Sequence, residues 1–141
     1  MLRDKITIRR YKLPDYPGVK QNLIEGKMFY ETIYSEAKMR TKIGNDPESI
    51  LVAEVNGEVV GNVYIVSDWG PLLFGLAVRK SCRNRGIGKR LVEEATKILK
   101  SKGFVDVNLL VRESRKNLHS MYEKWGFKKS NIYRWMYREI G

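Results

Sequence analysis

The first group of residues that could do chemistry is a basic turn with two glycines. It consists of Arg83, Asn84, Arg85, Gly86, Ile87, Gly88 and Lys89. A helix that begins in this turn presents unpaired backbone N–H groups and the positive end of its dipole, and both bind phosphate. The glycines remove side chains that would keep a pyrophosphate at a distance. The segment therefore predicts an anion site, and the alternative is a tight strand-to-helix turn that binds nothing.

Two other glycine loops do not fit this spacing. A Walker loop requires Ser or Thr after its Gly-Lys pair, but Gly88-Lys89 is followed by Arg90, and position 83 is not glycine. A dinucleotide fingerprint requires three glycines in the order GxGxxG, and only Gly86 and Gly88 are present. The turn is therefore neither of these nucleotide loops.

Regular elements must position this turn, and the hydrophobic pattern indicates them. Alternating or apolar runs predict strands over residues 5–11, 50–55, 58–66, 72–78, 105–111 and 132–139. Apolar residues at helical spacing predict helices over residues 19–41 (two pieces separated near Gly26), 87–102 and 115–125. This order implies a mixed α/β or α+β sheet in one domain that spans residues 1–141.

Several residues set the limits of these elements. Asn56-Gly57 predicts a type I′ turn that joins two strands into a hairpin. Gly103 and Gly126 are placed to end the two later helices, and Ser114 is placed to cap the last one.

Composition narrows the class of protein. The 141 residues suit one domain, and the 27 Lys and Arg against 16 Asp and Glu give a formal charge of +11. This excess favours nucleic acid or a phosphate-rich cofactor as partner, with a basic solvated surface as the alternative. Cys82 is the only cysteine, which excludes an internal disulfide and a cysteine-cluster metal site. No secretory signal or membrane-length apolar run is visible, which predicts a cytoplasmic protein away from membranes.

Two motifs together resemble the GCN5-related N-acetyltransferase (GNAT) family. The first is Arg83-x-x-Gly86-x-Gly88 after a strand that ends Leu76-Ala77-Val78, and the second is Tyr122-Glu123-x-x-Gly126-Phe127 at the end of the last helix. The resemblance covers roughly residues 50–130. It implies an α/β (α+β) single-domain fold: a central, mixed, mostly antiparallel sheet flanked by helices, with two central strands splayed to admit acetyl-CoA.

The resemblance also assigns residues to acetyl-CoA. It implies that the backbone of Leu76, Ala77 and Val78 pairs with the pantetheine arm. The amides of residues 84–89 would wrap the pyrophosphate, and the side chains of Arg83, Arg85 and Lys89 would add positive charge. Many relatives have a cofactor-contacting Asn where this chain has Arg115, so a contact from Arg115 to a phosphate or pantetheine oxygen is an open hypothesis.

The resemblance makes Tyr122 the general acid that protonates the departing thiolate, whereas helical spacing alone favours core packing for this residue. In one branch of the family, a Glu late in the strand before the last helix acts as the general base, and this chain has Leu110 at that position. Asp68, acting through water, is the remaining candidate base, and a turn-stabilising role is its alternative. His119 and Cys82 are interpreted as packing or surface residues.

The acceptor stays open: a small amine, a peptide N-terminus, a lysine or an aminoglycoside. Tyr30, Tyr34 and Trp69 could line its pocket or simply pack the core. Two rival functions also stay open, a non-catalytic acyl-CoA sensor on the same fold and a basic nucleic-acid-binding domain, although no nucleic-acid motif is present. Because members of this family are often dimers, the resemblance leaves both a monomer and a homodimer open for this chain.

Overall fold

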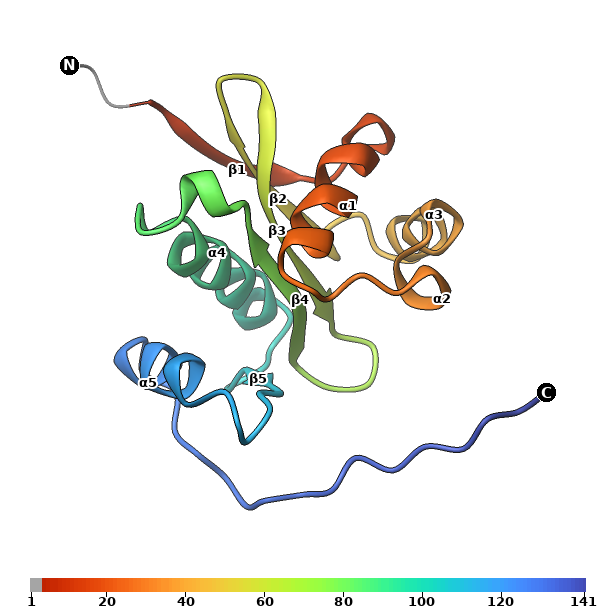
Figure 1. The fold of residues 1–141 in the computed structure, drawn as a ribbon, viewed down its shortest axis with the longest axis vertical. Helices are drawn as coiled ribbons and strands as arrows, with labels where there is room; N and C mark the ends of the chain where they lie inside the picture. Colours follow the sequence, from red (N-terminus) through yellow and green to blue (C-terminus); the bar gives the residue numbers. More distant parts are fainter. Residues whose placement is uncertain (1–3) are drawn as a thin grey trace. The chain divides into compact units, whose positions relative to one another are not determined.

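The apolar runs of the first 110 residues form one five-stranded sheet in the computed structural model, which describes residues 4–141 (Figure 1). The strands lie in chain order across the sheet: β1 (Ile6–Arg10), β2 (Ile50–Val55), β3 (Glu58–Val66), β4 (Leu72–Val78) and β5 (Asn108–Leu109). The first three pairings are antiparallel, and β4 pairs with β5 in parallel. The expected mixed, mostly antiparallel sheet is therefore confirmed.

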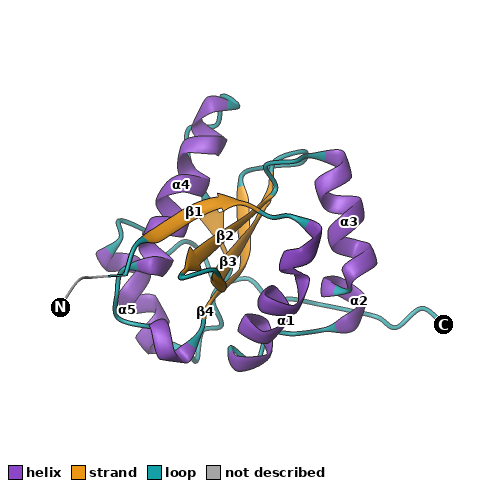
Figure 2. Ribbon diagram, turned by 90° about the horizontal axis from the view of Figure 1, so that it is seen from above, coloured by secondary structure: helices purple, strands orange, loops and turns teal. Residues whose placement is uncertain are grey.

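The helices that precede residue 111 cover both faces of this sheet (Figure 2). The helices of the described chain are η1 (Leu13–Asp15), α1 (Tyr16–Glu25), α2 (Glu31–Tyr34), α3 (Glu36–Asn45), η2 (Lys80–Cys82), α4 (Ile87–Ser101) and α5 (Lys116–Lys124). Gly18 of α1 lies so close to β3 that a Cβ there would meet Val59 Cβ at 2.9 Å. On the other face, a Cβ on Gly61 would meet Ile87 and Leu91 of α4, each at 3.2 Å. Glycine thus permits close helix–sheet packing on both sides of β3.

The chain divides into two compact units, Met1–Leu110 and Val111–Gly141. In the first unit, the apolar stripe predicted for α4 comprises Ile87, Leu91, Ala95, Ile98 and Leu99, and all of these are buried except Ile98, which is half-buried. In the second unit, α5 ends at Lys124, and Gly126, which follows the C-cap Trp125, has a φ of +94° that fits the predicted glycine stop. Among the helices of residues 4–141, none is long and apolar enough to cross a membrane.

Four expected boundaries differ from the structure. The region predicted as two helices over 19–41 contains three, because Ser35 starts a separate helix by accepting a hydrogen bond from the Lys38 N–H. The strand predicted over 105–111 shrinks to Asn108–Leu109. The last helix begins at Lys116, so that Arg115 rather than Ser114 is its N-cap, and this helix has no side-chain capping bond from a described residue.

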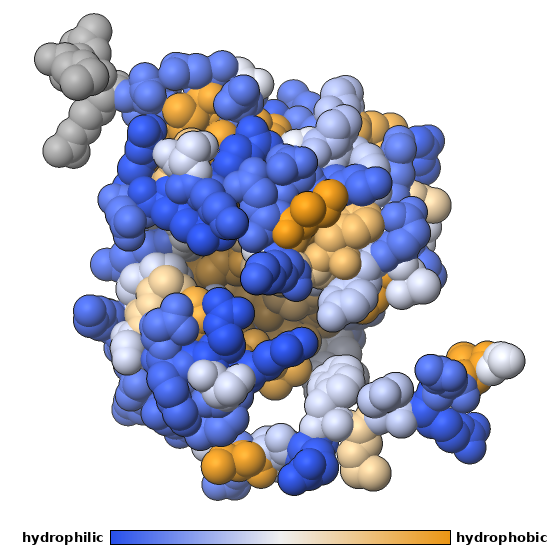
Figure 3. All heavy atoms as spheres, in the orientation of Figure 1, coloured by the Kyte–Doolittle hydropathy of each residue, from blue (hydrophilic) through white to orange (hydrophobic). Residues whose placement is uncertain are grey.

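The fourth difference concerns the C-terminal tail. The strand predicted over residues 132–139 is absent from the described structure, and the tail is extended (Figure 1). Tyr133, Trp135 and Tyr137 are all at least 80% exposed. In the space-filling view, hydrophobic and hydrophilic residues alike are exposed along the extended tail (Figure 3). Alternation predicts a strand only where a neighbouring strand supplies hydrogen bonds, and none pairs with the tail in residues 4–141.

One buried ion pair joins the first strand to the first helices. Arg9 donates two hydrogen bonds to the Asp15 carboxylate, at 2.8 Å and 2.9 Å, and the Lys12 N–H donates a third at 2.8 Å. Burial opposes ionisation of Asp15, but these hydrogen bonds outweigh it and hold the pKa of Asp15 below its ordinary value. The charged form of Asp15 is therefore part of the folded state.

We expect Asp15→Asn to lower the free energy of unfolding at pH 7 by about 2 kcal/mol, since it breaks charge-assisted bonds to a half-buried Arg9. Because the folded pKa is depressed, this contribution is present above the unfolded pKa and is lost as the pH falls through the folded value. Urea denaturation should thus show a smaller difference near pH 3. Glu48→Gln, which breaks an exposed 3.5 Å pair with Arg10, is the control and should cost under about 0.5 kcal/mol. An undiminished difference at low pH would contradict the assignment.

Candidate functional site

β4 carries a β-bulge where it separates from β5. Asn62 of β3 lies opposite Ala77 and Tyr64 lies opposite Phe74, so Val63 faces two residues of β4. One of the two is Gly75, whose φ is +62°. A Cβ on Gly75 would approach Tyr64 Cδ1 to 2.9 Å, so this backbone conformation requires glycine.

Beyond the bulge, one edge of β4 is open. β5 pairs only with Leu72 and Leu73, and no other strand of residues 4–141 pairs with that edge. The parallel pairing thus ends after two residue pairs, which is compatible with the expected splaying, but β5 is the edge strand of the described sheet and not a central one. The Arg79 N–H donates to the Val60 carbonyl of β3 at 2.7 Å. Strand alternation then directs the neighbouring Val78 carbonyl to the open edge, where it accepts a 3.0 Å hydrogen bond from Arg83 Nε.

The three strand residues expected to contact a cofactor differ in what they present. By the same alternation, Leu76 and Val78 direct backbone groups to the open edge, and Ala77 directs its own to β3. The Ala77 side chain is buried in the core. The open edge of β4 is therefore a row of backbone donors and acceptors able to pair with an extended ligand.

The basic turn leads directly from this edge into α4. Asn84 and Gly86 both have positive φ, +65° and +78°, and Gly86 is the N-cap of α4. The first helical hydrogen bond runs from the Arg90 N–H to the Gly86 carbonyl at 3.1 Å. Within the described part of the chain, the amides of residues 84–89 donate no hydrogen bond. The turn thus gathers free N–H groups at the positive end of a helix dipole.

The side chains of the turn add positive charge around these amides. Arg85 pairs with Asp4 at 3.7 Å and Lys89 pairs with Glu93 at 3.9 Å, and all four side chains are at least 45% exposed. Such exposed pairs are weak and exchange readily for another anion. Ile87 is different, because its side chain is buried under the sheet and only its backbone is available. A Cβ on Gly86 would meet nothing within 4 Å, so the space above the helix end is open.

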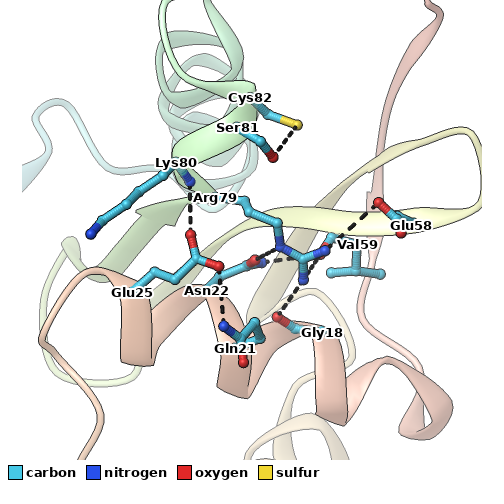
Figure 4. A network of polar contacts seen from close by, with 10 residues as sticks. All are labelled: Gly18, Gln21, Asn22, Glu25, Glu58, Val59, Arg79, Lys80, Ser81 and Cys82. Carbon is cyan, nitrogen blue, oxygen red and sulfur yellow. Dashed lines mark hydrogen bonds and ion pairs between the residues drawn. The ribbon is translucent and has the colours of Figure 1, made fainter.

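A polar network fastens α1 to both ends of this site, and Figure 4 shows the end that contains Arg79 and Lys80. Arg79 Nε donates to Asn22 Oδ1 at 3.1 Å, and Asn22 Nδ2 donates to Asn62 Oδ1 at 3.1 Å. Asn62 Nδ2 in turn donates to the Gly75 carbonyl at 2.8 Å. The sequence analysis did not identify these residues. The signal was available, since a polar Asn62 interrupts the apolar run of β3 and Gly75 interrupts that of β4.

The structure separates Asp68 from the basic turn. Asp68 is exposed in the connection before β4, whereas the turn follows the far end of that strand. The strand spans about 20 Å between them. Asp68 makes no hydrogen bond to any residue that the structure describes. The turn-stabilising alternative therefore gains no support from a side-chain hydrogen bond, and a role as base stays a hypothesis.

The aromatic residues expected near the acceptor fall into two groups. Tyr34 is buried with its ring 5.1 Å from that of Tyr64 and 6.3 Å from that of Phe74, and these rings belong to the core against β3 and β4. Tyr30 and Trp69 are exposed. Core packing thus accounts for Tyr34, while Tyr30 and Trp69 are free to meet another molecule.

Tyr122 and Arg115 lie in the second unit. The Tyr122 ring packs edge-on against Trp125 and Phe127, with centroids 5.4 Å and 5.6 Å away. Burial raises the pKa of the Tyr122 phenol, so it keeps its proton at neutral pH. Arg115 is the exposed N-cap of α5. His119 Nε2 lies 2.8 Å from the Arg112 carbonyl, which fits a structural role. The action of Tyr122 and Arg115 on a ligand stays a prediction.

Comparisons with known proteins agree with this geometry. The model of the acetyltransferase (GNAT) family matches residues 14–127. A curated acetyltransferase from Pectobacterium atrosepticum is 38% identical over 91 residues, which are 63% of this chain and 64% of that protein. The match thus spans slightly less than two thirds of that relative's length.

Solved structures share the fold. Ard1 from Thermoplasma volcanium superposes with a TM-score of 0.76 at 24% identity, covering 89% of this chain and 84% of that one. The PaiA N-acetyltransferase from Thermoplasma acidophilum, solved in complex with coenzyme A, gives a TM-score of 0.74 at 23% identity and covers 91% and 92%. At these identities the likeness concerns the arrangement of helices and strands.

Proposed function

This chain belongs to the acetyltransferase (GNAT) family, and from that premise we propose that it transfers the acetyl group of acetyl-CoA to a primary amine. The observation that carries the proposal is the continuity of the open edge of β4 with the free amides of residues 84–89. The first suits an extended amide-bearing arm, and the second suits a pyrophosphate.

The proposal assigns the pantetheine arm and the phosphates of acetyl-CoA to different parts of this arrangement. The backbone of Leu76 and Val78 would pair with the pantetheine arm, while the amides from Asn84 to Lys89 would hold the pyrophosphate. Arg83, Arg85 and Lys89 would balance the phosphate charge, and Arg115 is a further candidate from the second unit. The complex of the PaiA N-acetyltransferase with coenzyme A supports a coenzyme A ligand for the shared fold.

The reaction requires a nucleophilic amine and a protonated leaving group. Acetyl-CoA supplies a thioester whose carbonyl carbon accepts the amine nitrogen, and the carbon–sulfur bond then breaks. The Tyr122 phenol would give its proton to the departing thiolate, and the amine would lose a proton to water. Asp68 could assist that loss through water. Because an α-amine has a pKa near ~8 and a lysine near ~10.4, an α-amine needs less help from a base.

We expect acetyl-CoA at about 100-fold over its dissociation constant to raise the melting temperature by about 5 to 10 °C. Free coenzyme A should stabilise the protein comparably, since the phosphates carry the binding. Acetyl-pantetheine, which lacks the pyrophosphate, should give no shift at the same concentration. Thermal unfolding with the three ligands measures this directly.

Turnover is then measured as release of the coenzyme A thiol in the presence of a panel of α-amines, lysine peptides and aminoglycosides. Acetylation of one amine class would establish the acceptor. Binding without turnover across the panel would favour the acyl-CoA sensor instead. No stabilisation by acetyl-CoA, together with salt-dependent binding of RNA, would favour the nucleic-acid reading.

A further inference from the structure

Two buried asparagines and one arginine form a continuous polar chain between α1, β3 and the end of β4. Asn22 and Asn62 are both 0% exposed, and the side chain of Arg79 is 19% exposed. We call Asn22, Asn62 and Arg79 the buried polar chain. Buried polar side chains lower the stability of the folded protein unless each of them is hydrogen-bonded. Apolar side chains of similar size would fill the same space without needing hydrogen-bond partners. The presence of these polar groups therefore calls for a role besides burial.

The buried polar chain is fully bonded. Asn22 Nδ2 reaches the Val59 carbonyl at 3.3 Å in addition to Asn62, and Arg79 Nη2 reaches the same carbonyl at 3.1 Å. Among the buried side chains of residues 4–141, only the hydroxyls of Tyr11 and Tyr64 lack a hydrogen-bond partner. A complete network of this kind holds its members in one arrangement.

At one end, the buried polar chain fixes the direction of a peptide group in the bulge. Asn62 Nδ2 holds the Gly75 carbonyl toward β3 at 2.8 Å. The peptide between Gly75 and Leu76 is planar and trans, so its N–H points opposite to its carbonyl. The Leu76 N–H is therefore directed away from β3, toward the open edge. Without Asn62, Gly75 has no Cβ to restrict its rotation.

At the other end, the buried polar chain fixes the start of the basic turn. Besides its bond to Asn22, Arg79 donates through Nη2 to the Gly18 carbonyl at 3.4 Å and lies 3.8 Å from Glu58. One residue later, the Lys80 N–H donates to the Glu25 carboxylate of α1 at 2.9 Å (Figure 4). Helix α1 thus holds both the bulge and the turn, which lie at the two ends of the open edge.

We propose that Asn22, Asn62 and Arg79 are positioning residues that hold the Leu76 N–H and the start of the turn in register for one extended ligand. The proposal rests on the proposed function, because that ligand is acetyl-CoA. The physical basis is that a ligand bound both at the bulge and at the turn loses affinity when these two parts of the protein shift relative to each other by a fraction of an ångström.

The test compares Asn62→Ala with Ser49→Ala. Ser49 is also buried, but its hydroxyl donates to the Lys42 carbonyl of α3 at 3.3 Å rather than to β4. Both variants should lose thermal stability. We expect Asn62→Ala to weaken acetyl-CoA binding by about tenfold, and Ser49→Ala to leave it within about twofold of the wild type. Isothermal titration calorimetry with acetyl-CoA measures both affinities.

A second measurement needs no ligand. Amide hydrogen exchange of the free protein should rise at the hydrogen-bonded amides of Arg79, Lys80 and Cys82 in Asn62→Ala and stay at the wild-type level there in Ser49→Ala. Arg79→Lys, which is less buried and less disruptive, should show a smaller change of the same pattern and covers the case that Asn62→Ala does not fold. Double substitution of Asn22 and Asn62 by alanine should weaken acetyl-CoA binding no more than Asn62→Ala alone.

The outcomes separate the two proposals. A wild type that does not bind acetyl-CoA overturns the proposed function, and exchange at the amides of Arg79, Lys80 and Cys82 then decides whether Asn62 holds the start of the turn. Equal affinity in wild type and Asn62→Ala overturns the positioning role while the function stands. Exchange that rises evenly over the whole sheet, or equal loss of affinity in Ser49→Ala, overturns it as well.

Discussion

Gly86→Glu should abolish the stabilisation of this protein by acetyl-CoA. Gly86 is the N-cap of α4 and adjoins the free amides of residues 84–89. A glutamate side chain there places bulk and negative charge where the proposed site holds phosphates. Its carboxylate would repel the nearby phosphate groups, since both are negatively charged. We expect the melting-temperature shift to fall from about 5 to 10 °C to below about 1 °C.

Gly57→Glu is the matched control for the backbone. Gly57 has a φ of +79° against +78° for Gly86, and a Cβ meets nothing within 4 Å at either position. Both substitutions carry the same left-handed strain and should lower stability similarly, by about 1 kcal/mol. Only Gly86→Glu should lose the ligand response. A full response in Gly86→Glu would remove the turn from the proposed binding site.

The hairpin and the helix after the turn could be predicted because their signals are local. Asn56-Gly57 joins β2 and β3, whose bounds match the predicted strands, and both residues have positive φ. The apolar stripe of α4 repeats over about four turns, the helix ends at Ser101, and Gly103 follows its C-cap with a φ of +91°. In both elements the residue types that form the element also mark its ends.

The bulge and the buried polar chain could not be predicted in the same way. An isolated Gly75 suggests a bulge, but its partner Asn62 is 13 residues away and the next link, Asn22, is a further 40 residues away. No pattern within a single helix or strand indicates that the side chains of Asn22 and Asn62 are hydrogen-bonded to each other. The tail shows the opposite failure, since its alternation is a strand signal whose pairing depends on an edge elsewhere.

Tyr122→Phe should leave acetyl-CoA binding intact and lower kcat by about 100-fold with the amine that the panel identifies. The half-buried ring packs against Trp125 and Phe127, and burial raises the pKa of the phenol, so the phenol carries at neutral pH the proton that the proposed step requires. Phenylalanine keeps the ring and its packing and removes only the proton. Steady-state kinetics and the acetyl-CoA thermal shift measure the two effects separately.

Tyr137→Phe is the control, because this tyrosine of the same unit is 85% exposed. It should keep the wild-type kcat and the wild-type thermal shift. The size of the Tyr122→Phe effect should also depend on the leaving group. A more acidic thiol departs without a proton, so an acetyl thioester of such a thiol should lose less rate in the variant. An equal loss with both thioesters would contradict proton donation and assign Tyr122 a packing role.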